Sequence, residues 1–370
     1  MRIAVDAMGG DRAPGAVIEG ALLAQKELGI EVLLVGQKDV VETELARRSS
    51  SPTCLPIIPA SQAVAMDESP SAALKKKDSS MKVAFELLKR GEVQAFVSAG
   101  NSGAMMATGM FVLGNLPHVE RPAILVVVPT LTHAAVIIDA GATVDCKPRH
   151  LLQFALMGSI YAESVLGTPR PRVGVLSNGE EEGKGNDLTR AASEQIAATA
   201  LNFIGYVEGR DICGGNIDVV VCDGFTGNVT LKTMEGVAHF TVAVLKDAFQ
   251  KNTLSRLGYL LSRKALREAF ARLDHTEYGG ALLLGLDGVA IIAHGGSSPK
   301  EIKNAIRVAG EAVSHDVNRR ITEVLEELSH QAGDKFPGKI WRRIRSKIET
   351  AGEKNAVEEE ERKGKGDEKD

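Results

Sequence analysis

Short runs of apolar, mostly β-branched residues alternate with segments of helical hydrophobic spacing along most of the chain. The first run is Arg2–Asp6, and a glycine-rich turn and an amphipathic helical period follow it. Strands that alternate with helices form βαβ units, which predicts an α/β protein whose mainly parallel sheet carries helices on both faces. Further predicted strands lie at 32–35, 95–98, 173–176, 218–222 and 289–293.

Two more apolar runs, 124–128 and 134–138, are separated by a turn that contains Pro129 and His133. A turn this short cannot hold a crossover helix, so we expect an antiparallel pair and therefore a mixed sheet. The same turn interrupts the most apolar stretch of the chain. That interruption favours buried strands over a segment that crosses a bilayer.

Long helical periods occupy much of the second half of the chain. One covers 230–249, and another covers about 298–328. Between them, 254–273 carries two apolar sets at helical spacing, with Ser262 as the candidate break. This pattern predicts a protruding helical hairpin within 254–273.

The predicted hairpin is basic, although the whole chain is slightly acidic. Its first half is apolar at Leu254, Leu257 and Leu261. The pattern fits either a solvated face on a dimer arm or a landing site for an acidic partner or an anionic membrane. The basic residues, which oppose Glu268 alone, are Arg256, Arg263, Lys264, Arg267 and Arg272.

The chain after residue 334 differs in composition from the part before it. Residues 335–350 have an apolar and a basic helical face, which suits either a membrane interface or a terminal helix packed on its own domain. Residues 351–370 form a charged tail without apolar content, which is typical of disorder. We therefore expect one α/β domain over 1–334.

Composition narrows the classes of function. The 370 residues include 44 Lys and Arg against 48 Asp and Glu, and this net charge of −4 argues against nucleic-acid binding. The 4 cysteines form no CxxC pair, which argues against a zinc finger and a disulfide framework. The first apolar run is short and is cut by Asp6 and Asp11, unlike a signal peptide, so we expect a cytoplasmic protein.

Small-residue loops follow the predicted strands, and we expect them to line one cleft at the carboxyl ends of those strands. Backbone N–H groups in such loops favour bound anions, and phosphate is the natural candidate. No strand is followed by GxGxxG, and 179–185 departs from a P-loop in its spacing and its last residue. The candidate phosphate- or thioester-binding residues are Gly9, Gly10, Asp11, Gly100, Asn101, Ser102, Gly103, Asn178, Gly179, Gly227 and His294.

Lys184 is the first catalytic candidate, because it follows three glutamates and lies among glycines at the expected mouth of the cleft. A surface ion pair with one of those glutamates is the alternative, and it would contribute about 0–1 kcal/mol. Asn101, Asn178 and Asn228 lie in expected loops, where an amide either donates to a phosphate or thioester oxygen or stabilises a turn. His294 either transfers a proton or bonds a nearby carbonyl.

The sequence favours neither a covalent nor a metal-dependent route. It has no GxSxG elbow, and no loop cysteine lies beside an evident base. Acidic residues at the strand ends could hold a divalent metal, but without diagnostic spacing they are better interpreted as helix caps or loop-ordering groups. We therefore expect no metal and no cofactor. These carboxylates are Asp6, Asp11, Asp139, Asp145 and Asp223.

Several blocks of this sequence, in order, closely resemble the PlsX family. PlsX proteins are the acyl-carrier-protein-dependent phosphate acyltransferases of bacterial phospholipid synthesis. The resemblance covers about residues 1–330, and the blocks together are highly specific. They are DAMGGD at 6–11, SAGNSGA at 98–104, LSNGEEEGKG at 176–185, DGFTGN at 223–228, and YGGA at 278–281 through HG at 294–295.

The resemblance implies a three-layer α/β/α Rossmann-like fold, related to isocitrate dehydrogenase and phosphotransacetylase, in a homodimer. It implies transfer of a long fatty acyl group from acyl carrier protein to inorganic phosphate. The acyl phosphate product would serve the next acyltransferase, a membrane-bound enzyme that acylates glycerol 3-phosphate. The family's catalytic lysine and asparagine would fall on Lys184 and Asn228. The segment matching 254–273 is implicated in peripheral association with the inner face of the membrane.

Two positions depart from the family pattern. Ser102 replaces the usual Thr and keeps the hydroxyl, whereas Thr143 replaces the usual Asn and loses an amide. Two other functions remain open from the residues alone. One is a metal-dependent dehydrogenase of the isocitrate type, and the other is a non-catalytic membrane scaffold that binds acidic partners through the basic segment.

Overall fold

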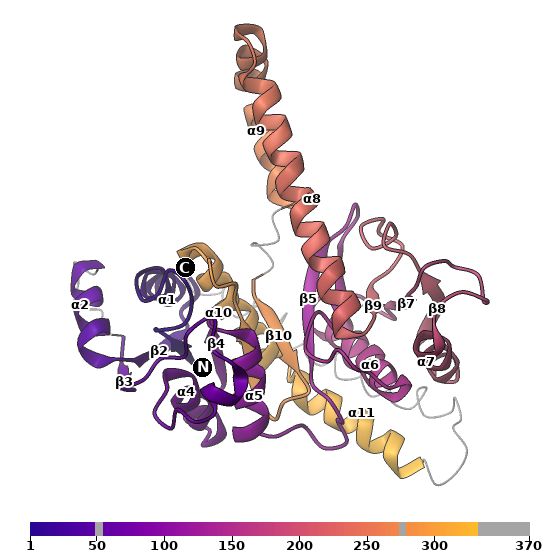
Figure 1. Cartoon of the computed structure of the whole chain (residues 1–370), viewed down its shortest axis with the longest axis horizontal. Helices are drawn as coiled ribbons and strands as arrows, with labels where there is room; N and C mark the ends of the chain where they lie inside the picture. The colour runs from indigo at the N-terminus through magenta and orange to yellow at the C-terminus, as the bar shows by residue number, and fades with distance from the viewer. Residues whose placement is uncertain (49–54, 274–278, 332–370) are drawn as a thin grey trace, which may run out of the picture.

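The computed structural model describes residues 1–48, 55–273 and 279–331 (Figure 1). The predicted amphipathic segment at 335–350 and the predicted disordered tail at 351–370 lie outside the described residues, as does Tyr278 of the family blocks. In the basic segment the structure describes side chains up to residue 267. The side chain of Arg272 therefore lies outside the described part.

The described residues form an eleven-stranded sheet in the order β3-β2-β1-β4-β11-β10-β5-β6-β9-β7-β8. Every strand predicted from the hydrophobic pattern is present, which confirms the mixed α/β assignment. The strands are β1 (Arg2–Asp6), β2 (Glu31–Gly36), β3 (Ile57–Pro59), β4 (Ala95–Ser98), β5 (Ala123–Pro129), β6 (Ala134–Ile138), β7 (Arg172–Leu176), β8 (Asn202–Val207), β9 (Val219–Val221), β10 (Ala281–Leu284) and β11 (Val289–Ile292).

Helices cover both faces of this sheet and complete the three layers. Alternate residues of β1 show the division, because Ile3 and Val5 belong to the apolar core on one face and Ala4 belongs to the core on the other. The helices are α1 (Gly15–Leu28), α2 (Lys38–Arg48), α3 (Pro70–Ala73), α4 (Ser80–Lys89), α5 (Ser102–Val112), α6 (Pro148–Ser164), α7 (Asp187–Ala197), α8 (Gly224–Gln250), α9 (Thr253–Leu273), α10 (Pro299–Ser314) and α11 (Val317–Gln331).

Strand direction reverses across the middle of the sheet. β1 is parallel to β2 and β4, and β4 is parallel to β11, whereas β10 is antiparallel to both β11 and β5. The tight β5–β6 turn reverses the chain again, and β6, β9, β7 and β8 then run parallel. The loops after β1, β4 and β11 therefore leave at one edge, and those after β6, β7 and β9 leave at the other. The expectation that all the loops share one edge is wrong.

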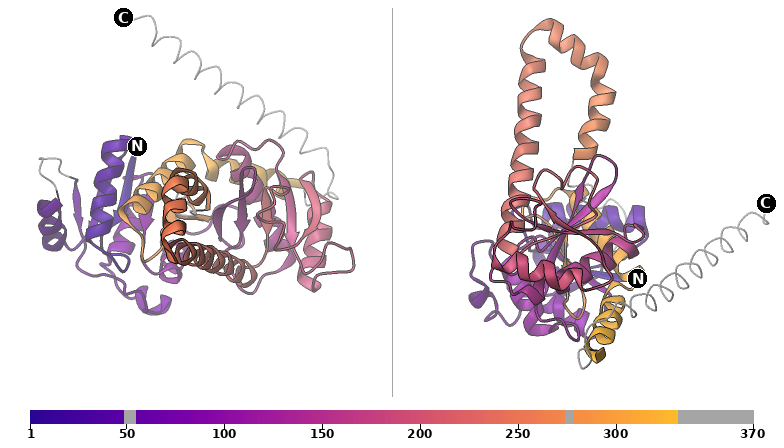
Figure 2. Two further views of the ribbon diagram at one scale, coloured as in Figure 1. Left: turned by 90° about the horizontal axis from the view of Figure 1, so that it is seen from above. Right: turned by 90° about the vertical axis from the view of Figure 1, so that its right-hand side faces the viewer.

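Helices α8 and α9 form a long antiparallel hairpin that projects from the body of the molecule (Figures 1 and 2). The turn lies at Lys251 and Asn252, so the predicted hairpin within 254–273 is wrong: α9 is one continuous arm. Ser262 does not break it, because its hydroxyl donates to the carbonyl oxygen of Gly258 within the helix. α8 begins earlier than predicted, because Asp223 caps it and accepts from Thr226 N at 2.9 Å.

The single helix predicted over about 298–328 is in fact two helices. α10 ends at Ser314, and Asp316 adopts a left-handed conformation with φ of 52° before α11 begins. Ser298 caps α10, as its position before an apolar helical period suggests. Among the described residues, no helix combines the length and the apolar character needed to cross a membrane.

We predict that Asp218→Asn destabilises the protein by about 2 kcal/mol near neutral pH. Asp218 Oδ2 accepts from Arg172 N at 2.7 Å and from Arg172 Nε at 2.9 Å, and Oδ1 lies 2.7 Å from His133 Nε2. Burial opposes the charged form, but these hydrogen bonds outweigh it and hold the pKa of Asp218 below its ordinary value of 3.8. Urea unfolding measures the loss.

Because the folded-state pKa of Asp218 is depressed, its contribution is present above the unfolded-state value and is lost as the pH falls through the folded-state value. The difference between wild type and variant should therefore shrink in acid. Glu31→Gln is the control, since its ion pair with Arg2 is about half exposed and should contribute under about 1 kcal/mol. Equal losses in both variants would contradict the prediction.

Candidate active site

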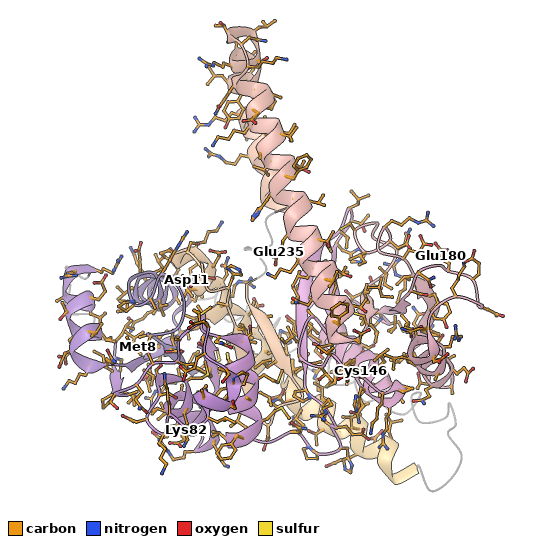
Figure 3. All side chains as sticks on the ribbon, in the orientation of Figure 1. Met8, Asp11, Lys82, Cys146, Glu180 and Glu235 are labelled. Carbon is orange, nitrogen blue, oxygen red and sulfur yellow. The ribbon has the colours of Figure 1, made fainter. Side chains whose placement is uncertain are left out.

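The predicted binding residues fall into two groups, one at each edge of the sheet. In Figure 3, Met8 and Asp11 lie in one half of the molecule, and Cys146 and Glu180 lie in the other. The first group follows β1, β4 and β11. The second group follows β6, β7 and β9, and it includes Lys184 and Asn228.

In the first group, three loops pack closely against one another. Asp11 N donates to Gly295 O at 2.8 Å, which joins the β1 loop to the β11 loop. A Cβ atom added to Gly9 would lie 2.8 Å from Gly100 N, so only glycine allows the β1 loop to approach the β4 loop this closely. Gly10 has a φ of 106° and faces the same two loops. His294 is exposed, and its Nδ1 accepts from Gly296 N at 3.1 Å.

The buried carboxylate of Asp6 holds the loops of this first group together. The carboxylate is 2% exposed and accepts hydrogen bonds from Ser98 Oγ at 2.8 Å and Met8 N at 3.0 Å. Burial raises the pKa of Asp6 despite these hydrogen bonds. The loop-ordering role predicted for the strand-end carboxylates is confirmed here.

Asn101 stabilises the β4 turn, the second of the two roles considered for it. Its Oδ1 caps α5 by accepting from Ala104 N at 2.9 Å, and its Nδ2 donates to Met66 O at 2.8 Å and Glu68 O at 2.9 Å. Both hydrogens of the amide are therefore committed. Ser102 and Gly103, in the first turn of α5, are exposed.

The loop after β7 holds Lys184. Asn178 Oδ1 accepts from Gly185 N at 2.9 Å, which closes the loop around Gly179. Gly179 is buried, and a Cβ atom added there would lie 2.7 Å from Lys184 Cγ, so the lysine stem lies directly over the glycine. Among the described residues, the ammonium group makes no ion pair, and Glu180 pairs with Arg210 at 3.2 Å instead. The surface ion pair considered as an alternative for Lys184 is therefore absent from the part of the chain that the structure describes.

Asn228 is in the first turns of α8 rather than in a loop, which corrects the sequence-based expectation. Its neighbour Gly227 is buried, and a Cβ atom there would collide with the carbonyl oxygen of Asp139. Glycine at position 227 therefore lets the start of α8 pack directly on the end of β6. The Asn228 side chain is exposed and has no hydrogen-bond partner among the described residues.

Asp139 joins the loop after β6 to the start of α8. It is 0% exposed, and its carboxylate accepts from Ile124 N at 2.8 Å, Gly141 N at 3.1 Å and Thr143 N at 2.7 Å. Burial raises its pKa, although these bonds favour the charged form. The ordered loop places Gly141 beside Asn228, since a Cβ atom on Gly141 would lie 3.8 Å from Asn228 Oδ1.

A cavity of 410 Å³ lies between the β7 loop and the first turn of α8. Neither Lys184 nor Asn228 lines it, but Gly185 and Thr226 do. Two residues along an α-helix turn the side chain by about 200°, so Asn228 lies on the other side of α8 from Thr226. The cavity is lined by Leu176, Ser177, Asn178, Gly185, Asn186, Thr189, Cys222, Asp223 and Thr226.

The cysteines near this cavity are poor nucleophiles. Burial raises the pKa of Cys146 to about 12 and raises that of Cys222 well above its ordinary value. Both thiols therefore stay protonated near neutral pH. Within the residues that the structure describes, no group of histidine, cysteine and acidic side chains could hold a metal ion.

The predicted docking residues lie on α9 and project into solvent. The exposed fractions of Leu254, Leu257 and Leu261 are 79%, 53% and 80%. The basic residues of this arm, Arg256, Arg263, Lys264 and Arg267, are also exposed.

Sequence reasoning missed how Gly141 and Thr226 contribute to the site. Gly141 has a φ of 138°, and its approach to Asn228 depends on the hydrogen bond that its N–H donates to Asp139 Oδ1. Thr226 faces the cavity only because α8 begins before it. An Asp-x-Gly sequence directly after a strand was the available signal for the first of these.

Comparisons with known proteins agree with the observed fold and with the family resemblance of the sequence blocks. A family model described as "Fatty acid synthesis protein" matches residues 1–320. A phosphate acyltransferase of Geotalea uraniireducens is 55% identical over 328 residues, which are 88% of this chain and 95% of that protein. One from Geobacter sp. strain M21 is 51% identical over 353 residues, or 95% of this chain and 98% of the relative.

Among solved structures, a phosphotransacetylase from Streptococcus pyogenes matches with a TM-score of 0.59 at 14% identity, covering 85% of this chain and 94% of that one. EutD phosphotransacetylase from Staphylococcus aureus matches with a TM-score of 0.55 at 13% identity, over 85% and 94%. At these identities the likeness concerns the fold alone. With the family match and the close relatives, it follows that this chain belongs to the PlsX family of fatty acid synthesis proteins, which are phosphate acyltransferases.

Proposed function

We propose that this enzyme transfers a long-chain fatty acyl group from acyl carrier protein to inorganic phosphate and so forms acyl phosphate for phosphatidic acid synthesis. The observation that carries the proposal is a pair of uncommitted polar groups, one in the loop after β7 and one at the start of α8, which follow the neighbouring strands β7 and β9. Lys184 and Asn228 keep an ammonium and an amide without protein partners in the described structure, while the neighbouring side chains of Asn178 and Asp223 are used to hold the loops.

Phosphate binds beside Lys184 in this proposal. The adjoining cavity lies on the Thr226 side of α8, away from Asn228, and its hydroxyls are committed, because Thr226 Oγ1 donates to Asp223 Oδ2 and Ser177 Oγ donates to Asn178 Oδ1. We therefore assign phosphate to the Lys184 ammonium group rather than to the cavity. The positive end of the α8 dipole points toward the same place. The ammonium charge and the helix dipole compensate a dianion that must leave water to reach its electrophile.

The reaction then needs little proton transfer. A phosphate oxygen attacks the thioester carbonyl carbon, the new C–O bond forms, and the carbonyl oxygen becomes an oxyanion that Asn228 Nδ2 stabilises by donating a hydrogen bond. The tetrahedral intermediate collapses as the C–S bond breaks, and the carrier leaves as a thiolate that takes a proton from water. Phosphate is already anionic near neutral pH, so no strong base is required.

The loops after β1, β4 and β11 leave at the opposite edge of the sheet from Lys184, and we propose that they bind the thioester donor or phosphate at that separate place. Their backbone N–H groups, such as those of Ser102 and Gly103, are better suited to this binding than the Asn101 amide, whose hydrogens are committed. The family assignment replaces both alternative functions, the isocitrate-type dehydrogenase and the non-catalytic scaffold, with phosphate acyl transfer.

Acyl carrier protein is acidic, and we propose that it docks on the basic arm α9 of a homodimeric enzyme. The exposed leucines of the same arm would let the enzyme associate peripherally with the inner face of the membrane. The membrane-bound glycerol-3-phosphate acyltransferase would then consume the product close to where it forms.

We predict that Lys184→Ala and Asn228→Ala each lower kcat/KM by about a hundredfold, the usual effect of removing one group that stabilises developing charge. The measurement is phosphate-dependent release of free carrier thiol from long-chain acyl carrier protein. Lys38→Ala is the matched control, because Lys38 is an exposed lysine on α2 whose ion pair with Glu42 spans 3.7 Å. The proposed function fails if wild type shows no phosphate-dependent turnover.

A second prediction separates lysine placement from folding. Gly179→Ala should push the Lys184 stem aside and lower kcat by about tenfold, with little change in the unfolding temperature, because the displaced atoms belong to flexible side chains. Gly183→Ala, in the same loop, meets nothing within 4 Å and should keep full activity. Equal activity in the two variants would argue against a role for the position of Lys184.

For the docking arm, we expect the double variant Arg263→Glu, Arg267→Glu to raise KM for acyl carrier protein substrates about tenfold while leaving acyl coenzyme A turnover nearly unchanged. The effect should weaken as salt rises, because screening already reduces the attraction. Lys26→Glu with Lys38→Glu makes the same charge change on α1 and α2 and serves as the control. If that control raises KM equally, only overall charge matters.

A further inference from the structure

Two apolar clusters on one face of the sheet meet beside the candidate active site. One lies under α3, α4 and α5, and the other lies between β6, β9 and the start of α8. Val126 of β5 and Leu231 of α8 pack against both clusters, so they mark the place where the clusters join. Both side chains remain partly exposed.

The floor of this junction is formed by β5 and β10. Leu282 pairs with Leu125 and Leu283 pairs with Ile124, so one step further along the antiparallel ladder Ala281 lies opposite Val126. Ala281 is also partly exposed, although it packs on the apolar cluster below α5. In Figure 1, β10 and β5 run in the interval between α5 and α8. At this junction the helices do not fully cover the sheet, so Val126 and Ala281 are partly exposed to solvent.

The junction is continuous with the proposed reaction centre. Leu231 follows Asn228 by one helical turn, so the two side chains share a face of α8. Ala142, a fourth partly exposed apolar residue, directly follows Gly141, which lies against Asn228. We call the group of Val126, Ala142, Leu231 and Ala281 the apolar seam.

We propose that the apolar seam holds the hydrocarbon chain of the acyl donor, and this inference rests on the proposed function. If Asn228 donates to the thioester oxygen, the chain must leave the carbonyl carbon close to Ala142 and Leu231. The seam residues offer only aliphatic side chains, and a bound alkyl chain would remove both surfaces from water. Each buried methylene group contributes about 0.8 kcal/mol, so seam length and depth set the preferred chain length.

The seam suits an alkyl chain better than a second copy of the protein. Its residues are partly buried and lie between elements, whereas Val237 and Phe240 further along α8 are 58% and 70% exposed. A protein partner would bury the exposed outer residues of α8 first. The recessed residues beside Asn228 are left for a narrow ligand.

The test is to fill the seam and measure chain-length selectivity. Val126→Phe adds a ring to its floor, and kcat/KM should fall roughly tenfold for every two methylene groups that lose contact. Palmitoyl and butyryl acyl carrier proteins are compared with phosphate as acceptor. We expect a large loss for palmitoyl transfer and a change within about twofold for butyryl transfer. Ala281→Leu fills the same floor less drastically and should give a smaller shift in the same direction.

Val83→Phe is the matched control, since Val83 on α4 is likewise partly buried against the same cluster but lies away from the seam. It should leave the palmitoyl-to-butyryl ratio of kcat/KM unchanged. Thermal unfolding checks that each variant folds. If Val126→Phe does not fold, the selectivity of Ala281→Leu tests the proposal instead. Absence of turnover by wild type with every donor would overturn the proposed function.

Other outcomes bear on the seam alone. If wild type is active and both seam variants leave the ratio unchanged, or lower both substrates equally, the seam does not hold the chain. A change in sedimentation coefficient without a change in the ratio would assign the seam to contact between copies instead.

Discussion

The buried carboxylate of Asp139 is the group on which the arrangement of the candidate active site depends. It directly follows β6, accepts backbone hydrogen bonds from β5 and from the following loop, and lies against the first turn of α8. A carboxylate without water is stable only when such donors surround it. The same bonds therefore fix the loop, the start of α8 and, through Gly141, the surroundings of Asn228.

A second constraint is the reversal of strand direction. Strands β10 and β5 are antiparallel to each other and to their outer neighbours β11 and β6, and they separate two parallel halves, so glycine-rich loops that look equivalent in sequence emerge at opposite edges. The β1, β4 and β11 loops pack on one another, whereas the β7 and β9 loops meet around the cavity and the start of α8. Similar turn chemistry thus serves two separate places within one chain.

Many of the secondary-structure elements could be predicted from the sequence, because they are determined by residues close together in the chain. The strand runs, the antiparallel pair around the Pro129 turn and the capping carboxylates follow from alternation, turn length and side-chain chemistry. The edge at which each loop emerges depends on pairing between distant strands, which periodicity does not encode. The sequence analysis placed the turn of the hairpin at Ser262 instead of at Lys251 and Asn252. The Ser262 hydroxyl donates a hydrogen bond within the helix, so this polar residue does not end α9. The commitment of the Asn101 amide needed the neighbouring segment at Met66 and Glu68, which is remote in sequence.

Helix α8 has a mechanical consequence. Its 27 residues, at about 1.5 Å each, make a rod about 40 Å long with Asn228 near one end and the turn into α9 at the other. The rod is hydrogen-bonded without interruption, and its base is seated on Asp139. A load on the far tip is therefore carried along one continuous helix to the surroundings of Asn228, without passing through the sheet.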